Sequence, residues 1–398
     1  MSRCVVTRRF GELASFRNGV NYSAASRDAG TLAVIGVREF QRNERLSRFD
    51  QLERITRPPG LDDDALLRNG DLIFVRSNGN KELIGRCMLL EGITVPLTHS
   101  GFTIRARLTT PNIDPEWIVQ YFTTGLARKA IMRRGGGTNI SNLSQQILQD
   151  LPIPVPDLGY QTNVLRVANQ LSDSLQILRA LRASKKLFRR GLMQQLLTGQ
   201  RRFRGFPDHP WIEIRLGDVF EERNEIDRLD LPLLSVTADR GLIPRDQLSK
   251  RDTSNPDKSK YKRVTLGDIA YNTMRMWQGV SALSTLEGIV SPAYTVATPT
   301  DKISGHFAKH LFKYPPVVNL FHRHSQGLVD DTLNLKFDRF SKIKLAIPRD
   351  TDEQARIAGV LDVCDTEIKL LSTLGKEFED YKRALLSRLF SSDVKVPA

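Results

Sequence analysis

The sequence predicts an α+β fold. Two globular domains, each with mixed short strands and helices, would be separated by two long antiparallel coiled-coil helices. Three observations predict this fold. A run of regularly spaced apolar residues occurs twice, a proline-rich extended segment precedes each run, and short motifs of the first half return in the second. Together they indicate a pseudo-two-fold internal repeat.

The two long helices are predicted over Gln161–Gly199 and Gln354–Ser391, where apolar residues recur every three or four positions. Each run covers about 37 residues, or roughly 55 Å of helix, which favours a coiled-coil seam over a short globular helix. The alternative is two separate amphipathic helices that pack on their own domains. The ten seam positions of the second run each follow those of the first by 193 residues: Val164, Val167, Leu171, Leu175, Leu178, Leu181, Lys185, Phe188, Leu192 and Leu196, then Ile357, Val360, Cys364, Ile368, Leu371, Leu374, Phe378, Tyr381, Leu385 and Leu389.

The segments before the helices repeat as well. Leu151–Pro156 precedes the first helix, and Leu345–Pro348 precedes the second. Proline prevents a helix from extending backwards, so an extended strand is expected in both places. Thr351 and Gln354 have capping-box spacing, which predicts a helix start near residue 352.

The repeat includes the globular parts, because Arg9–Leu13 resembles Arg215–Val219 and Arg68–Ile73 resembles Thr265–Ile269. We therefore divide the chain into a first globular domain (1–150), a first long helix (151–202), a second globular domain (203–346) and a second long helix (347–398). Within the domains the composition predicts strands over 71–76, 102–106 and 289–297, and helices over 115–134 and 306–324.

Connectivity predicts that the two helices run antiparallel. The second globular domain joins the end of the first helix to the start of the second, and a parallel pair would force the chain to cross roughly 55 Å of helix. Charge agrees with this expectation. The basic second half of the first helix would face the stretch that contains Asp362, Asp365 and Glu367.

The composition favours a polyanionic partner. The 398 residues carry a formal net charge of +14 and have a pI near 9.8. The segment from Gln161 to Arg202 contains nine basic residues and one acidic residue, a net charge of +8. This charge predicts either a solvated basic face or a surface that binds phosphates or an acidic partner. No run approaches 18 apolar residues, and the three cysteines lie far apart, so we expect a cytoplasmic protein without membrane spans or disulfides.

The motifs of common enzymes are absent from the sequence. There is no phosphate-binding G-x-x-x-x-G-K-[ST] loop and no dinucleotide-binding glycine pattern, so no cofactor is expected. His306 and His310 have the i,i+4 spacing of metal ligands, but no Cys or carboxylate completes an evident set, so no metal is predicted. The chain is therefore expected to bind rather than to catalyse.

Several polar and basic loops are candidates for DNA contact, because Arg, Asn and Lys donors suit base edges and phosphates. In the first domain they are Arg76, Ser77, Asn78, Asn80, Lys81, Arg133, Arg134, Thr138 and Asn139. In the second domain they are Lys260, Lys262, Arg263, Tyr271, Asn272, Arg275, Trp277 and Gln278, in the corresponding place. Each loop alone could equally be solvated surface, and the agreement between the two copies favours binding.

These residues resemble a known family, the specificity subunits of type I restriction–modification systems. The resemblance covers nearly the whole chain. Its motifs are Leu151–Pro156 followed by Gln161, Leu192–Gly199, Ile347-Pro348 with Glu353-Gln354, Tyr271–Arg275, and Gly288–Tyr294, which adds Tyr294 to the candidate DNA contacts.

The resemblance implies two target-recognition domains, each reading one half of an interrupted target in double-stranded DNA. It also implies that two methyltransferase (modification) subunits dock on the helices, and that restriction subunits add ATP-driven translocation and cleavage. S-adenosylmethionine, ATP and Mg²⁺ would be bound by those partners and not by this chain. Two other classes stay open: a stand-alone bipartite DNA-binding regulator, and a scaffold that does not bind DNA.

Overall fold

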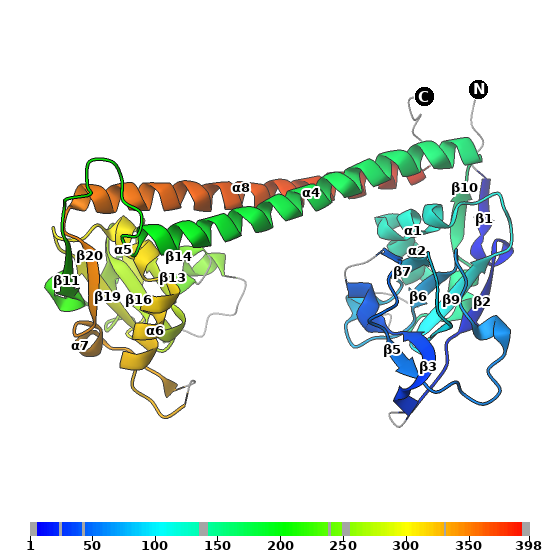
Figure 1. Cartoon of the computed structure of the whole chain (residues 1–398), viewed down its shortest axis with the longest axis horizontal. Coiled ribbons are helices and arrows are strands. Elements are labelled where there is room, and N and C mark those ends of the chain that lie inside the picture. The colour runs from blue at the N-terminus through cyan, green and yellow to red at the C-terminus, as the bar shows by residue number, and fades with distance from the viewer. Residues whose placement is uncertain are drawn as a thin grey trace. The chain divides into compact units, whose positions relative to one another are not determined.

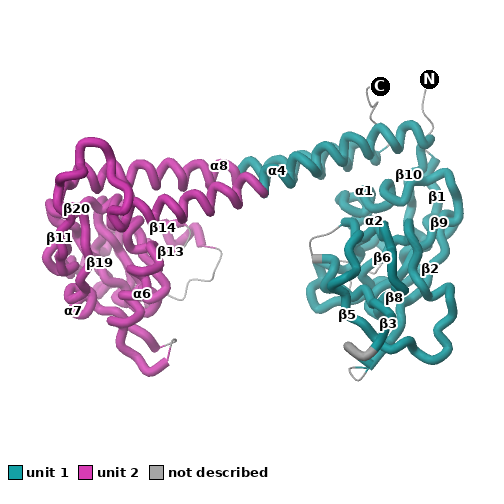
Figure 2. Tube along the Cα trace, viewed as in Figure 1, with its two compact units in different colours: residues 1–179, 373–398 teal, residues 180–372 magenta. Residues whose placement is uncertain are grey.

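A computed structural model describes residues 6–23, 26–41, 44–134, 142–237, 240–248, 255–329 and 332–391. The chain divides into two compact units, residues 1–179 with 373–398 and residues 180–372 (Figure 2). Each unit contains one β-rich domain and parts of both long helices, α4 (Leu158–Leu196) and α8 (Thr351–Phe390) (Figure 1). The predicted α+β fold with two packed long helices is confirmed.

The first domain is built on a five-stranded sheet that is buried on both sides. Along strand β6 (Leu72–Val75), Leu72 and Phe74 pack in the core beneath α1 (Pro115–Thr123), whereas Ile73 and Val75 face a second core. The sheet order is β2 (Ala14–Asn18), β9 (Thr103–Leu108), β6, β7 (Cys87–Leu90), β4 (Arg45–Leu46). A second sheet has the order β5 (Glu53–Ile55), β3 (Arg27–Ile35), β8 (Leu97–His99).

The second domain repeats this arrangement around strand β16 (Ile269–Asn272). Ile269 and Tyr271 enter the main core, and Ala270 faces a smaller one. The main sheet has the order β12 (Phe220–Glu222), β19 (Tyr294–Pro299), β16, β17 (Ser281–Leu283). Two smaller pairs are β13 (Leu234–Thr237) with β14 (Gly241–Pro244), and β15 (Lys262–Val264) with β18 (Gly288–Val290).

The predicted single helices over 115–134 and 306–324 are each two helices. In the first domain α1 ends at Thr123, and α2 (Gly125–Arg134) follows the extended residue Thr124. In the second domain α5 (Gly305–Leu311) and α6 (Pro315–His324) are separated at Tyr314, which is extended because Pro315 follows it. The predicted strand over 289–297 is likewise divided between β18 and β19.

Each domain closes with a strand pair at the point where a long helix begins. Strand β1 (Val6–Arg9) pairs antiparallel with β10 (Pro152–Val155), and β11 (Trp211–Arg215) pairs in the same way with β20 (Lys344–Pro348). The Asp157 carboxylate accepts the Tyr160 N–H at 2.9 Å at the start of α4. The Asp350 carboxylate accepts the Asp352 N–H at 2.8 Å at the start of α8, so Asp350 is the cap and not Thr351.

A fully buried glutamine joins each helix to its domain. The Gln161 Nε2 donates to Pro156 O (2.9 Å) and Asn112 O (3.0 Å), while Oε1 accepts the Asp114 N–H (2.9 Å). The glutamine therefore binds the end of β10 and the residue that caps α1.

Gln354 makes the same three bonds in the second domain. Its Nε2 donates to Pro348 O (2.9 Å) and Lys302 O (3.1 Å), and its Oε1 accepts the Ser304 N–H (2.8 Å) ahead of α5. The internal repeat therefore extends to individual hydrogen bonds.

The two long helices run antiparallel within each unit. In the first unit the Tyr160 hydroxyl donates to Leu389 O (2.8 Å), and Arg179 Nη2 donates to Glu379 Oε1 (2.6 Å). Residue numbers therefore rise along α4 as they fall along α8.

The second unit shows the same order. Lys185 Nζ donates to Glu367 (2.8 Å), and Arg189 Nη2 donates to Asp365 (2.9 Å). The basic half of α4 therefore faces Asp365 and Glu367 as expected, whereas Asp362 pairs with Lys309 and His310 of α5.

Part of the predicted seam is exposed. The side chains of Leu181, Phe188, Leu374 and Tyr381 lie on the surface of the helix pair. A pair of helices can bury only the stripe between them, and the globular domains cover further residues only near the helix ends. Among the described residues, no helix is long and apolar enough to cross a membrane.

Replacing the buried glutamine tests its role. We expect Gln161→Leu to lower the free energy of unfolding by about 2 kcal/mol or more, because it leaves three backbone groups without partners. Gln170→Leu, at an exposed position of α4, is the matched control. Thermal unfolding followed by circular dichroism makes the measurement, and equal melting temperatures for the two variants would contradict the assignment.

Candidate nucleic-acid interface

Three segments meet at one backbone junction in the first domain. The loop after β6 begins at Arg76, whose N–H donates to Phe102 O (2.8 Å) in the turn before β9. The Leu143 N–H, beyond helix α2, donates to Arg76 O (2.8 Å). The first residue of the candidate loop is therefore held through both its N–H and its C=O group.

The same junction occurs in the second domain. The Thr273 N–H, just after β16, donates to Ala293 O (3.2 Å), and the Leu335 N–H donates to Thr273 O (2.9 Å). Arg76 corresponds to Thr273, Phe102 to Ala293, and Leu143 to Leu335. The predicted correspondence between the two candidate loops is thus reproduced in the backbone.

The first loop presents amide donors on an ordered backbone. Asn78 Oδ1 accepts the Asn80 N–H (2.8 Å), and Asn80 Oδ1 accepts the Glu82 N–H (3.0 Å) at the start of the 3-10 helix η5 (Lys81–Leu83). Because both carbonyl oxygens are used within the loop, the NH₂ groups are the ends that suit a ligand acceptor. Arg76 is half-buried and its Nη1 donates to Gly101 O (3.4 Å).

Next to this loop lies a concavity of about 600 Å³, bordered by Ser77, Asn78 and Phe102. The Phe102 ring is 63% exposed, which is unusual for a phenylalanine and suits stacking on a base. Phe102 was not among the predicted contacts, because its exposure depends on the turn that carries it.

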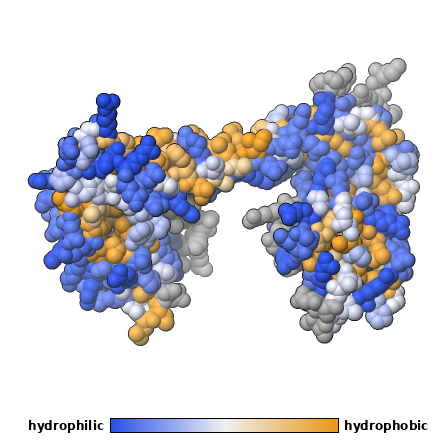
Figure 3. Space-filling view, in the orientation of Figure 1, coloured by the Kyte–Doolittle hydropathy of each residue, from blue (hydrophilic) through white to orange (hydrophobic). Residues whose placement is uncertain are grey.

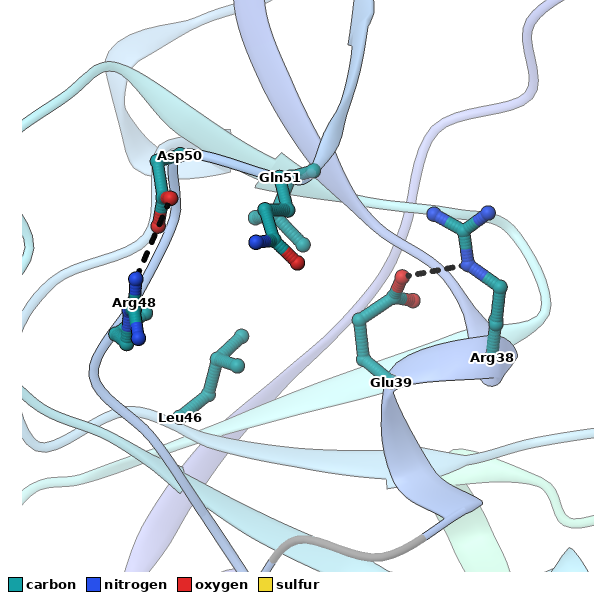
Figure 4. Close-up of a pocket in the computed structure, with 7 residues that line it drawn as sticks. Arg38, Glu39, Leu46, Arg48, Asp50 and Gln51 are labelled. Carbon is teal, nitrogen blue, oxygen red and sulfur yellow. Dashed lines mark hydrogen bonds and ion pairs between the residues drawn. The ribbon is translucent and has the colours of Figure 1, made fainter.

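A neighbouring depression of about 510 Å³ has balanced charges (Figure 4). Arg38 pairs with Glu39 (3.3 Å), and Arg48 lies 3.7 Å from Asp50. The concavity beside Asn78 is also bordered by Arg38 and Glu39, together with Glu53, so neither hollow attracts a polyanion by its own charge. The candidate surface is therefore the polar loop of Asn78 itself.

The remaining candidates of the first domain lie at the end of α2. Arg133 and Arg134 are exposed in its last turn. Thr138 and Asn139 lie outside the described residues. Ser77 is half-buried in the loop, and Lys81 is exposed at the first position of η5.

In the second domain Lys260, Arg275 and Gln278 are exposed. The Trp277 indole N–H donates to Met274 O (3.0 Å), and its ring meets the His322 ring edge-on at 5.7 Å. These contacts fix the 3-10 helix η8 (Met276–Gln278) against α6.

Asn272 and Tyr294 lie at the ends of their strands. Asn272 Oδ1 accepts the Met274 N–H (3.0 Å). Tyr294 is half-buried, and this burial raises the pKa of its hydroxyl. Both remain candidate contacts.

Three predicted contacts have structural roles instead. Tyr271 is fully buried with its ring 5.3 Å from that of Phe340, and burial raises the pKa of its hydroxyl, so it is a core residue. Lys262 pairs with Glu222 at 3.1 Å. Arg263 donates to both Glu225 (2.9 Å) and Glu287 (2.5 Å), so its charge is already balanced.

Lys313 is a positioning residue that the sequence did not indicate. Its Nζ donates at 2.5 Å to the carbonyl of Gly279, the left-handed residue that ends η8. Burial lowers the Lys313 pKa to about 8. The bond holds the end of the candidate loop from the segment between α5 and α6.

The structure brings two carboxylates, Asp362 and Asp365, to His310, so the expectation that no carboxylate completes a set there is wrong, but both carboxylates are already paired with cations. The buried His310 Nε2 lies 2.9 Å from Asp362, and Nδ1 lies 3.8 Å from Asp365. Lys309 already pairs with Asp362, and Arg189 with Asp365, so both carboxylates are neutralised. Burial lowers the His310 pKa to about 4, which leaves a neutral ring within this ion-pair network.

No family model matches the chain. The specificity subunit of the type I restriction enzyme EcoKI from Escherichia coli (strain K12) is 33% identical over 107 residues, which are 26% of this chain and 23% of that protein. The match thus spans about a quarter of the length of that relative.

Solved structures match over nearly the whole chain. The HsdS subunit from Thermoanaerobacter tengcongensis has a TM-score of 0.50 at 15% identity, with 98% of this chain and 97% of that chain covered. The type I system S subunit from M. genitalium has a TM-score of 0.53 at 13% identity, with coverage of 99% and 97%. A chain from a study of complex assembly in the type I R-M system has a TM-score of 0.63 at 17% identity, with 98% of both chains covered. This chain therefore has the fold of the type I specificity subunits.

Removing an exposed cation from the second domain tests the interface. We expect Arg275→Ala to weaken duplex binding and to reduce the slope of log K against log salt by about one, because one phosphate charge would lose its partner. Fluorescence anisotropy at several salt concentrations measures the slope. Arg228→Ala is the control, since Asp230 already pairs with that guanidinium at 2.8 Å, and an unchanged slope for Arg275→Ala would exclude a charge contact.

Proposed function

We propose that this chain is the DNA-specificity subunit of a type I restriction–modification system. The observation that carries the proposal is the duplicated junction. In each domain the first residue of a polar loop is held by two backbone hydrogen bonds. Arg76 bonds Phe102 and Leu143 in one copy, and Thr273 bonds Ala293 and Leu335 in the other. Two such loops in one chain suit a target with two half-sites.

Each domain would read one half of an interrupted sequence in double-stranded DNA. Asn78 and Asn80 offer NH₂ donors for acceptors on base edges, and Gln278 offers an amide that can pair with an adenine edge. Lys81, Lys260 and Arg275 offer cations for phosphates or guanine. The two helices would set the gap between the half-sites, as dimer geometry sets half-site spacing in other DNA-binding proteins.

Two equivalent apolar stripes support the docking of two copies of one partner. Helical periodicity places Ile177, Leu181 and Phe188 on one side of α4, and Leu370, Leu374 and Tyr381 on one side of α8. These side chains are 43–67% exposed, and each member of the second stripe follows one of the first by 193 positions. Figure 3 shows apolar residues exposed along the helices.

Methyltransferase (modification) subunits are the partners proposed for these stripes. They would supply S-adenosylmethionine chemistry, while restriction subunits would supply ATP- and Mg²⁺-dependent translocation and cleavage. This chain would contribute recognition and spacing and no catalytic residue. A stand-alone DNA-binding regulator is the second candidate, and the exposed stripes disfavour it because such a protein would leave them uncovered.

Charging one stripe tests the docking surface. We expect Leu370→Glu/Leu374→Glu to yield a complex with fewer than two modification subunits by native mass spectrometry, because burying a carboxylate without a partner is costly. Leu229→Glu changes an exposed leucine outside the helices and should leave the complex intact. Retention of both subunits by the double variant would contradict docking on this stripe.

Lengthening both helices tests the spacing role. Inserting one heptad at the centre of α4 and one at the centre of α8 adds about 10 Å while keeping their register. The gap in the methylated target should then grow by about 3 base pairs, at roughly 3.4 Å per pair. Seven residues added after Ala398 serve as the control, and a constant gap would refute the role of the helices as a ruler.

A further inference from the structure

An arm closed by backbone hydrogen bonds follows helix α6 in the second domain. The backbones of Gln326 and Asn334 exchange two hydrogen bonds, at 2.9 and 2.8 Å. Closer to the tip, the Thr332 N–H donates to Val329 O at 2.9 Å. Gly327 has a φ of 151°, and a Cβ there would lie 2.7 Å from the Thr332 backbone, so the two sides of the arm approach closely.

The tip of this arm carries uncovered apolar side chains. Leu328 is 100% exposed, more than any other large apolar side chain in the described ranges, and Val329 is 62% exposed. Burial of a leucine is worth about 1.5–3 kcal/mol, so this position forgoes that stabilisation unless a partner covers it. A single exposed leucine is ordinary, so the feature to explain is the position of Leu328 on an arm closed by backbone hydrogen bonds.

The arm is part of the proposed DNA surface. It ends at Leu335, whose N–H donates to Thr273 O, two residues before Arg275. Arg323 and Lys336 flank its base and are exposed. Cations at the base suit the phosphate backbone, whereas the tip suits an apolar environment.

We propose that Leu328 and Val329 form a wedge that inserts between two stacked base pairs of the half-site read by the second domain. The proposal rests on the proposed function. Apolar side chains inserted at a base step unstack it and kink the duplex, and the cost is recovered by the wider contact that the bend permits.

The test uses the full chain in complex with its modification subunits and a duplex that carries the mapped target. 2-Aminopurine replaces a base in turn at each position of both half-sites, and its fluorescence reports unstacking. We expect a several-fold rise at one step of one half-site. Leu328→Gln/Val329→Gln should abolish this rise and weaken binding about tenfold. Leu266→Gln, an exposed leucine of the same unit outside the arm, should retain both.

Sequence-specific binding without a rise that depends on Leu328 and Val329 overturns the wedge and leaves the proposed function standing. A rise that survives the double variant belongs to another distortion, such as extrusion of a base for methylation, and also overturns it. Loss of the modification subunits from the double variant would make the tip a protein contact. Absence of any sequence-specific binding by the wild-type complex would instead overturn the proposed function.

Discussion

In each half of the chain, one buried glutamine joins the long helix to its globular domain. Gln161 and Gln354 each supply two donors and one acceptor in places where a charged side chain would be costly and an apolar one would leave backbone groups unpaired. Each glutamine lies on the long helix and binds both the end of the strand before that helix and the residue that precedes a short helix of the domain, α1 or α5. The direction in which a domain leaves its helix is thus fixed by three hydrogen bonds.

The ion pairs between the helices have a different role. Lys185 with Glu367 and Arg179 with Glu379 are largely exposed, and such pairs contribute little to stability. Their value is specificity, because they match only in the antiparallel register. They also neutralise some of the positive charge of α4. The cations left exposed in the domain loops, such as Lys260 and Arg275, are then the ones suited to DNA.

The periodic features of the fold could be predicted from the sequence, and the non-periodic ones could not. The helices and their direction follow from a spacing repeated 193 positions apart, together with the charge of each half. The break at Thr124 was missed because its hydroxyl and N–H both bond Tyr121 O, a local choice without a strong sequence sign. The break before Pro315 is predictable, because proline disfavours the helical conformation of the residue that precedes it.

The candidate site was predicted in part for a similar reason. A polar loop after a buried strand can be recognised locally, so the Asn78 and Arg275 loops could be proposed as candidates. The burial of Tyr271 and the pairing of Arg263 depend on strands distant in the sequence, and composition does not reveal them. The exposed ring of Phe102 and the bond from Lys313 were missed because both depend on tertiary contacts.

We propose that this chain directs methylation to a bipartite DNA sequence. Single-molecule methylation sequencing of host DNA, with the gene intact and with it deleted, tests that claim most directly. The account predicts an interrupted motif, methylated in both half-sites, that is present with the gene and lost without it. An identical methylation pattern in the two strains, with the modification subunits expressed in both, would contradict it.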